Sequence, residues 1–102
     1  MLRRARPGDK DIAASREVIV RNKLGLHARP AAEFVRHAKS FRCEVWLVKE
    51  GQRYSAESLI DVLRANLDCG ASVILEARGA DAEVAVIRLE ELLEEFRKRG
   101  ED

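Results

Sequence analysis

One histidine, followed closely by an arginine and a proline, is the part of this chain best suited to chemistry. These residues lie in the segment Leu24-Gly25-Leu26-His27-Ala28-Arg29-Pro30-Ala31-Ala32. Histidine is a nucleophile whose unperturbed pKa of about 6.5 leaves much of it neutral at cellular pH. A guanidinium two residues further on brings positive charge and hydrogen-bond donors that suit phosphate oxygens. The combination indicates a phosphoryl group carried on His27.

The sequence on either side predicts that His27 stands where a strand passes into a helix. A β-branched apolar segment, residues 18–20, precedes the glycine turn, and apolar residues at helical spacing follow it. We expect a strand over 16–21 and a helix over 28–39, whose first turn tolerates Pro30. The first backbone N–H groups of a helix have no internal acceptor, and the helix dipole places about half a positive charge there. Such a helix end can bind a phosphate.

Simpler roles are open to the same residues. His27 could merely cap the helix, and Arg29 could be a solvated surface charge. The phosphate hypothesis therefore depends on an imidazole that is open to solvent at the helix N-terminus. His37 lies in a charged stretch, so we expect an exposed helix residue there rather than a second phosphate site.

Composition limits the class of protein. The 102 residues allow one domain, with an apolar fraction of 46% and a charged fraction of 36%. A net charge of +1 argues against a general nucleic-acid binder. The chain shows neither a signal peptide nor an apolar run of about 20 residues, so we expect a cytoplasmic protein without membrane insertion. Cys43 and Cys69 lack metal-ligand spacing and should be reduced thiols, and we expect neither metal nor cofactor.

Charge is distributed unevenly along the chain. Between residues 21 and 42 six basic side chains occur against one acidic residue, Glu33. Between residues 81 and 95 the acidic side chains dominate, with Arg88 as the exception. Because His27 lies in the basic part, we expect a partner with an acidic face there.

The remaining elements complete an α+β pattern. Residues 1–15 are expected to be a flexible extension and 16–100 the domain. Alternation predicts a strand over 43–48, a hairpin turn at Glu50-Gly51 and a short strand over 52–56. Ser58 and Asp61 have the form of a capping box that opens a helix over 58–66. A fourth strand over 72–76 and a final helix from Asp81 give the order β-α-β-β-α-β-α, typical of a two-layer domain with its helices on one face.

This order and the segment 22–32 resemble the histidine-containing phosphocarrier (HPr) family of the bacterial phosphoenolpyruvate-dependent sugar phosphotransferase system. The similarity covers about residues 16–97. It implies an open-faced β-sandwich, a four-stranded antiparallel sheet with three helices. It also implies that enzyme I phosphorylates His27 at Nδ1 and that His27 passes the group to an enzyme IIA. Arg29 and the backbone N–H groups of Ala28 and Arg29 would hold the phosphate.

The resemblance also extends to Ser58. In the family, the corresponding serine is the regulatory site of HPr kinase/phosphorylase in many bacteria. Glu57 and Asp61 depart from the residues common there, and Asp61 would repel a phosphate at this helix start. The simplest role of Ser58 is that of an N-cap hydroxyl, which contributes about 1 kcal/mol.

A docking surface is expected beside His27. At least one of Leu59, Ile60 and Leu63 should belong to the core. The resemblance implies that apolar residues at these positions are exposed. We expect two of them, with Leu26 and Ala32, to form a small apolar contact ringed by the basic side chains Arg29, Arg36 and Lys39. Such a surface suits brief docking of a monomer to several partners, burying less than about 1,200 Å².

Other functions share some of these features. A regulatory phosphorelay of the nitrogen type would use the same histidine chemistry, so the motif does not separate it from sugar transport. A module acting through contact alone, switched at Ser58, would need neither His27 nor Arg29. The sequence contains no nucleotide-binding loop, metal cluster or carboxylate pair near the histidine. We therefore expect a phosphotransfer intermediate rather than a stand-alone enzyme.

Overall fold

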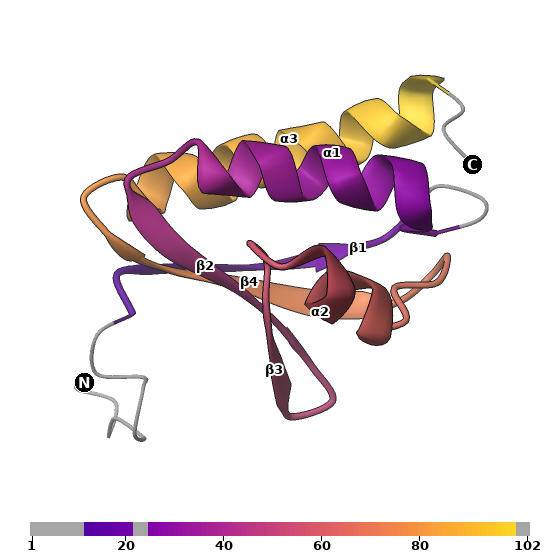
Figure 1. Cartoon of the computed structure of the whole chain (residues 1–102), viewed down its shortest axis with the longest axis horizontal. Coiled ribbons are helices and arrows are strands. Elements are labelled where there is room, and N and C mark those ends of the chain that lie inside the picture. Colours follow the sequence, from indigo (N-terminus) through magenta and orange to yellow (C-terminus); the bar gives the residue numbers. More distant parts are fainter. Residues whose placement is uncertain (1–11, 22–24, 100–102) are drawn as a thin grey trace.

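The computed structural model describes residues 12–21 and 25–99, which form four strands and three helices. In chain order these elements are β1 (Ala14–Ile19), α1 (Ala28–Lys39), β2 (Cys43–Lys49), β3 (Gln52–Ser55), α2 (Leu59–Arg64), β4 (Ser72–Gly79) and α3 (Ala82–Arg99). The predicted order of elements is confirmed (Figure 1).

The first strand begins earlier than the sequence indicated. β1 starts at Ala14, two residues before the predicted strand, because Ala14 pairs with Ala77 of β4. The N–H of Ala13 also donates to the carbonyl of Ala77, at 2.9 Å. Most of the predicted N-terminal extension, residues 1–11, lies outside the described residues.

The four strands form one antiparallel sheet in the order β1-β4-β2-β3. The register places Val18 opposite Val73, and Leu47 opposite Leu75. Because side chains alternate between the two faces of a strand, these residues all point to the same side of the sheet. Residues of the other alternation, such as Trp46 and Ile74, lie on the open face.

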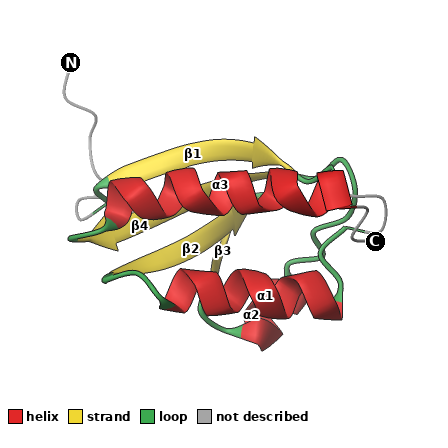
Figure 2. Ribbon diagram, turned by 90° about the horizontal axis from the view of Figure 1, so that it is seen from above, coloured by secondary structure: helices red, strands yellow, loops and turns green. Residues whose placement is uncertain are grey.

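The helices cover one face of the sheet. Seen from above, α1 and α3 run side by side across it, and α2 lies next to α1 (Figure 2). The prediction of an open-faced sandwich with its helices on one face is confirmed. On the uncovered face Arg53 lies over the ring of Trp46, 4.0 Å from the ring centre, and pairs with Glu76 at 3.4 Å. Within the described ranges, none of the helices has the length and apolar character needed to cross a bilayer.

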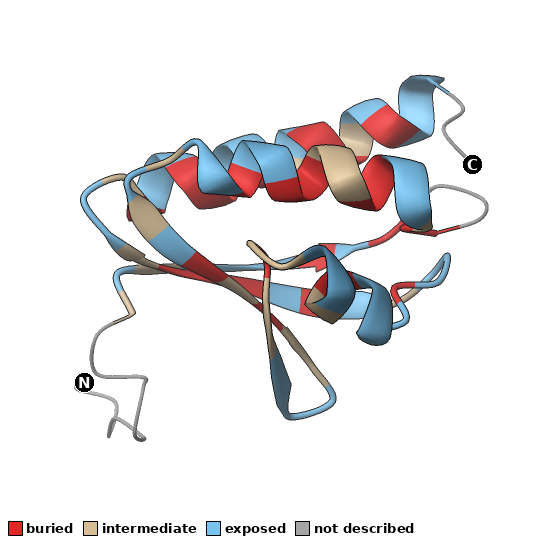
Figure 3. Ribbon diagram, in the orientation of Figure 1, coloured by how far each residue is buried: buried red, intermediate tan, exposed pale blue. Residues whose placement is uncertain are grey.

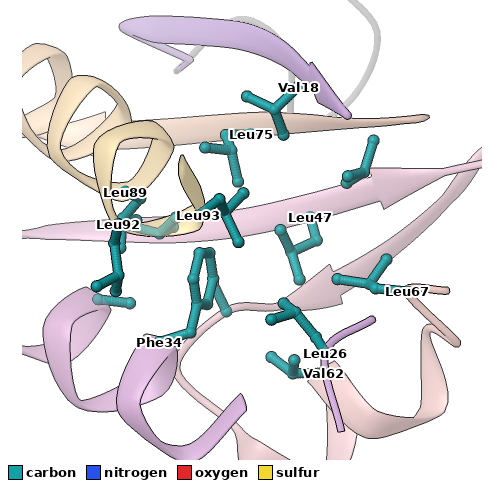
Figure 4. Packing of buried hydrophobic residues seen from close by; sticks show 14 of the residues in the cluster. Val18, Leu26, Phe34, Leu47, Val62, Leu67, Leu75, Leu89, Leu92 and Leu93 are labelled. Carbon is teal, nitrogen blue, oxygen red and sulfur yellow. The ribbon is translucent and has the colours of Figure 1, made fainter. Parts of the chain in front are cut away.

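The core lies between the sheet and the two long helices. Buried residues recur along both long helices and within the strands (Figure 3). Its largest fully buried side chains include Phe34 of α1, Leu47 of β2, Leu75 of β4, and Leu89 and Phe96 of α3. Figure 4 shows Phe34 directed from α1 toward the sheet. Burying a side chain of this size stabilises the fold by about 1.5–3 kcal/mol.

The ends of α3 follow ordinary capping rules. The carbonyl of Asp81 accepts the first helical hydrogen bond, from the N–H of Ala85 at 2.8 Å. The carboxylate of Asp81 accepts the N–H of Arg42, also at 2.8 Å, which ties the start of α3 to the segment between α1 and β2. The last turn carries the basic residues Arg97, Lys98 and Arg99, which suit the negative end of the helix.

Two residues of α3 provide a test of this packing. Leu89 is fully buried, whereas Ile87 in the same helix is 40% exposed. We expect Leu89→Ala to lower the free energy of unfolding by about 2–5 kcal/mol, because it leaves a cavity in the core. Ile87→Ala should change it by less than about 1 kcal/mol. Urea unfolding of both variants measures the difference, and equal losses would contradict this arrangement.

Candidate functional site

His27 is the N-cap residue of α1. Its backbone is extended, with φ −86° and ψ −169°, and its carbonyl accepts the N–H of Ala31 at 2.9 Å. The imidazole makes no capping hydrogen bond to the described part of the chain. Among the described residues, the His27 ring therefore does not act as a side-chain cap of α1. The ring is left available for another task.

The two ring nitrogens of His27 have different surroundings. The residue is half-buried, and Nε2 is enclosed without a hydrogen-bond partner among the described residues. Nδ1 is not enclosed in this way. The sequence hypothesis pictured a ring open to solvent. The structure has a half-buried ring, and of its two nitrogens Nε2 is the enclosed one.

The first turn of α1 brings no negative charge to the N-terminus of the helix. Its first turn, all of which the structure describes, holds no acidic residue. The N–H groups of Ala28 and Arg29 have no acceptor within the helix, and Pro30 has no N–H to offer. The side chain of Arg29 is exposed and forms no ion pair with any described residue. An anion beside His27 would therefore meet two backbone donors and a guanidinium that no described carboxylate pairs with.

Gly25 fixes how the chain reaches His27. Its φ is +72°, a conformation that side chains rarely adopt. A Cβ atom here would lie 2.3 Å from the carbonyl oxygen of Leu67 and 2.8 Å from Cα of Asp68. The next residue, Leu26, donates its N–H to that same Leu67 carbonyl at 2.9 Å. The turn that carries His27 is thus placed directly against the segment that follows α2.

Leu26 does not belong to the docking surface, contrary to the prediction. Only 5% of the residue is exposed, and Figure 4 shows its side chain beside Val62 in the core. The hydrogen bond to Leu67 sets the direction of the backbone here, and that direction turns the side chain inward. Leu26 therefore anchors the loop that carries His27.

All three apolar residues singled out in α2 are on the surface. Leu59, Ile60 and Leu63 are 38%, 70% and 39% exposed, so the prediction that at least one lies in the core is wrong. Val62, which is fully buried, takes that place. In a helix of six residues only a narrow side can face the core, and here that side is the one carrying Val62.

Helix α1 presents basic side chains next to this apolar group. Glu33 pairs with Arg99 of α3 at 3.2 Å, which shows that this side of α1 faces α3. Ala32 and Lys39 lie on the opposite edge of α1, toward α2. Arg36 and Lys39 are exposed, and like Arg29 they form no ion pair with the residues that the structure describes. Most other arginines in the described chain are paired, namely Arg16, Arg42, Arg53, Arg64, Arg78, Arg88, Arg97 and Arg99.

We call these side chains together the docking surface: Leu59, Ile60 and Leu63 on α2, with Ala32, Arg36 and Lys39 on α1. Helices α1 and α2 lie side by side, so the two groups adjoin (Figure 2). Lacking acidic partners of their own, the cations of α1 keep their charge available to another molecule.

Ser58 acts as an N-cap, as predicted. Its hydroxyl accepts the N–H of Asp61 at 3.2 Å. The capping box is not reciprocal, however, because the Asp61 carboxylate accepts the N–H of Ser55, at 3.2 Å. The carboxylate of Glu57 accepts the N–H of Val45 on β2, also at 3.2 Å. Two carboxylates therefore bind backbone on either side of Ser58, an arrangement that the spacing of the residues did not reveal.

Other reactive side chains lie elsewhere. Cys43 and Cys69 are both free thiols. Burial, and then the charges of Asp81 and Glu57, raise the pKa of the Cys43 thiol, so it is a poor nucleophile at neutral pH. His37 is exposed, with its ring 3.9 Å from Glu33, as expected of a surface residue.

Comparison with known proteins identifies the family. A family model described as the PTS HPr component phosphorylation site matches residues 14–95. The chain belongs to the HPr family. The phosphocarrier protein HPr of Borreliella burgdorferi is 35% identical over 83 residues, covering 81% of this chain and 96% of that protein. The HPr-like protein Crh of Bacillus subtilis is 38% identical over 79 residues, covering 78% of this chain and 93% of Crh.

Solved structures of the HPr family share this fold. The crystal structure of HPr from Bacillus anthracis matches with a TM-score of 0.75 and 32% identity, covering 78% of this chain and 94% of that one. A crystal structure of Bacillus subtilis Crh, described as a swapped dimer, matches with a TM-score of 0.66 and 38% identity over 78% of this chain and 92% of Crh. The family is that of the phosphocarriers of the phosphotransferase system, as the resemblance in sequence implied.

A comparison of two glycines separates the effect on stability of the close contact at Gly25 from the effect of its unusual φ. Gly51 has a similar φ of +79°, but a Cβ there would meet no described atom within 4 Å. We expect Gly51→Ala to cost about 1–2 kcal/mol from φ alone. Gly25→Ala should cost at least about 2 kcal/mol more, because the Leu67 carbonyl must also move. Urea unfolding tests this, and equal costs would show that the contact with Leu67 is unimportant.

Proposed function

We propose that this HPr-family protein accepts a phosphoryl group on Nδ1 of His27 from phosphorylated enzyme I and passes it to an enzyme IIA. The observation that carries the proposal is the geometry of His27 itself. Its ring, with Nε2 enclosed, stands at the N-terminus of a helix whose first turn holds no acidic residue, two residues before an arginine that forms no ion pair with the described residues. The family match supports the same chemistry.

In the accepting step the lone pair of Nδ1 attacks phosphorus in line with the donor bond. The new Nδ1–P bond forms as the bond between phosphorus and the donor group of enzyme I breaks. The proton of the neutral imidazole stays on Nε2, on the enclosed side of the ring and away from the phosphate. In the donating step the Nδ1–P bond breaks as the acceptor group of enzyme IIA bonds to phosphorus.

The chain contributes positioning and charge rather than covalent help, which is what phosphoryl transfer needs most. The N–H groups of Ala28 and Arg29 can donate to two phosphate oxygens, and the Arg29 guanidinium can balance the remaining charge. These donors are in place before the phosphate arrives, so little reorganisation accompanies the transfer.

The docking surface fits partners with an acidic face. Its exposed leucine and isoleucine side chains offer a small apolar contact, and Arg36 and Lys39 lie beside it without an ion pair to any residue in the described ranges. A contact of less than about 1,200 Å² suits complexes that form and dissociate rapidly. Every residue in this scheme comes from one chain, so a monomer suffices. We place the reaction in the cytoplasm, where the two free thiols would stay reduced.

Regulation at Ser58 has weaker support than transfer through His27. The Ser58 hydroxyl is engaged as the cap of α2, and the carboxylates of Glu57 and Asp61 lie on both sides of it. A phosphate of about −2 charge would have to break the cap and enter this negative surrounding. A regulatory phosphorelay of the nitrogen type would use His27 identically, so the identity of the enzyme I that phosphorylates the protein separates the two branches.

Replacing His27 tests the proposed carrier directly. With enzyme I and labelled phosphoenolpyruvate, the wild type should take up one acid-labile phosphate, and His27→Ala should take up none. His37→Ala is the matched control, because it removes an exposed histidine one helix turn beyond Glu33, and it should be labelled like the wild type. Label retained by His27→Ala would refute the proposal.

The role of Arg29 can be separated from a structural one. We expect Arg29→Ala to slow phosphorylation about 10- to 100-fold, since a hydrogen bond to a charged group contributes roughly 1.5–3 kcal/mol. The free energy of unfolding should change by less than about 0.5 kcal/mol, because the side chain is exposed. Arg88→Ala on α3 serves as the control and should leave the rate unchanged. A large loss of stability in Arg29→Ala would instead make this arginine structural.

A further inference from the structure

Lys49, the last residue of β2, binds the C-terminal end of α2. Its Nζ donates to the carbonyl oxygens of Ala65 at 2.9 Å and Asn66 at 2.6 Å. The last carbonyl groups of a helix have no hydrogen-bond donor within the helix, and they lie at the negative end of its dipole. An ammonium group there supplies both the donors and the positive charge. Lys49 is half-buried, which distinguishes it from an ordinary surface lysine.

Lys49 binds the segment that follows α2. The turn that carries His27 lies against the same segment. Ala65 is the C-cap of α2, and Asn66 has a φ of +53°, an uncommon conformation outside glycine. The next carbonyl, that of Leu67, accepts the N–H of Leu26 at 2.9 Å. It is also the oxygen that a side chain on Gly25 would strike. The carbonyl that fixes the approach to His27 therefore belongs to the residue directly after Asn66, whose own carbonyl Lys49 binds.

We propose that Lys49 is a positioning residue for His27. By holding the carbonyls of Ala65 and Asn66, it keeps the Leu67 carbonyl where Gly25 and Leu26 meet it, and so sets the place of the imidazole at the start of α1. The part of this inference that concerns phosphoryl transfer rests on the function proposed above; the structural link does not.

The hydrogen bonds from Lys49 are needed because α2 has little stability of its own. A helix of six residues is far shorter than the roughly 12–15 residues at which isolated helices become even marginal. Its N-terminus is held by the Ser58 cap and the carboxylate of Asp61. At its C-terminus, Lys49 joins it to β2 of the sheet. The same side chain thereby steadies Leu59, Ile60 and Leu63 of the docking surface.

Three variants test the role of Lys49. Lys49→Met keeps much of the apolar stem but removes the ammonium donors. Lys49→Arg keeps the charge and donors on a side chain of similar length. Lys98→Met removes an equally positive side chain from the exposed last turn of α3 and controls for net charge.

The first measurement is amide hydrogen exchange, which needs no phosphorylation. In Lys49→Met the amide of Leu26 should exchange at least about tenfold faster, since its acceptor is no longer held, whereas the amide of Leu75 in β4 should be unchanged. Lys49→Arg should recover most of the protection, and Lys98→Met should behave as the wild type. Unchanged exchange at Leu26, or an equal rise at Leu26 and Leu75, would overturn the proposal.

The second measurement is the rate of His27 phosphorylation by enzyme I. Lys49→Met should lower kcat about three- to tenfold, with partial recovery in Lys49→Arg, because a misplaced imidazole reacts more slowly once docked. An unchanged kcat together with faster exchange at Leu26 would show that Lys49 holds the Leu67 carbonyl but does not position His27. That result would overturn the claim that Lys49 is a positioning residue. A wild type that accepts no phosphate would refute the carrier function, while Leu26 exchange would still report on Lys49.

Discussion

The approach of Gly25 to the Leu67 carbonyl is the contact on which the geometry of the site depends. A residue with a side chain does not fit at that distance, and Leu26 uses the same oxygen as its hydrogen-bond acceptor. Through this oxygen the loop before α1 is joined to the segment after α2, although about 40 residues separate them along the chain. His27 follows directly, so its position depends on packing between two distant parts of the sequence as much as on the helix that it begins.

Electrostatics then distinguishes this end of the molecule from the rest of its surface. Elsewhere arginines are mostly paired with nearby carboxylates, often within one helix, as with Arg97 and Glu94. That pairing lowers the pKa of the Glu94 carboxyl. Near His27 the pattern changes, and Arg29, Arg36 and Lys39 form no ion pairs with the described residues. Exposed pairs contribute little to stability, so leaving these cations unpaired costs the fold little and retains positive charge for a partner or a phosphate.

The sequence predicted the elements well and the exposure of individual side chains less well. Periodicity located both ends of α1 correctly and the other elements to within a few residues, because alternation and helical spacing are local properties. It misjudged Leu26 and the apolar residues of α2. Whether a leucine is buried depends on how its loop or short helix is oriented against the sheet, and local spacing holds little information about that. The contacts of Lys49, Glu57 and Asp61 were missed for the same reason, since each joins a side chain to a backbone group contributed by another element.

By itself the sequence determined the chemistry and the family: a histidine, an arginine and a proline at a helix start, in an order of elements that resembles HPr. These are properties of residue type and local spacing. Tertiary structure decided which ring nitrogen is enclosed, which cations form no ion pair within the described chain and which apolar residues reach the surface. Those outcomes depend on contacts between segments far apart in the chain, and such contacts exist only once the helices are packed on the sheet.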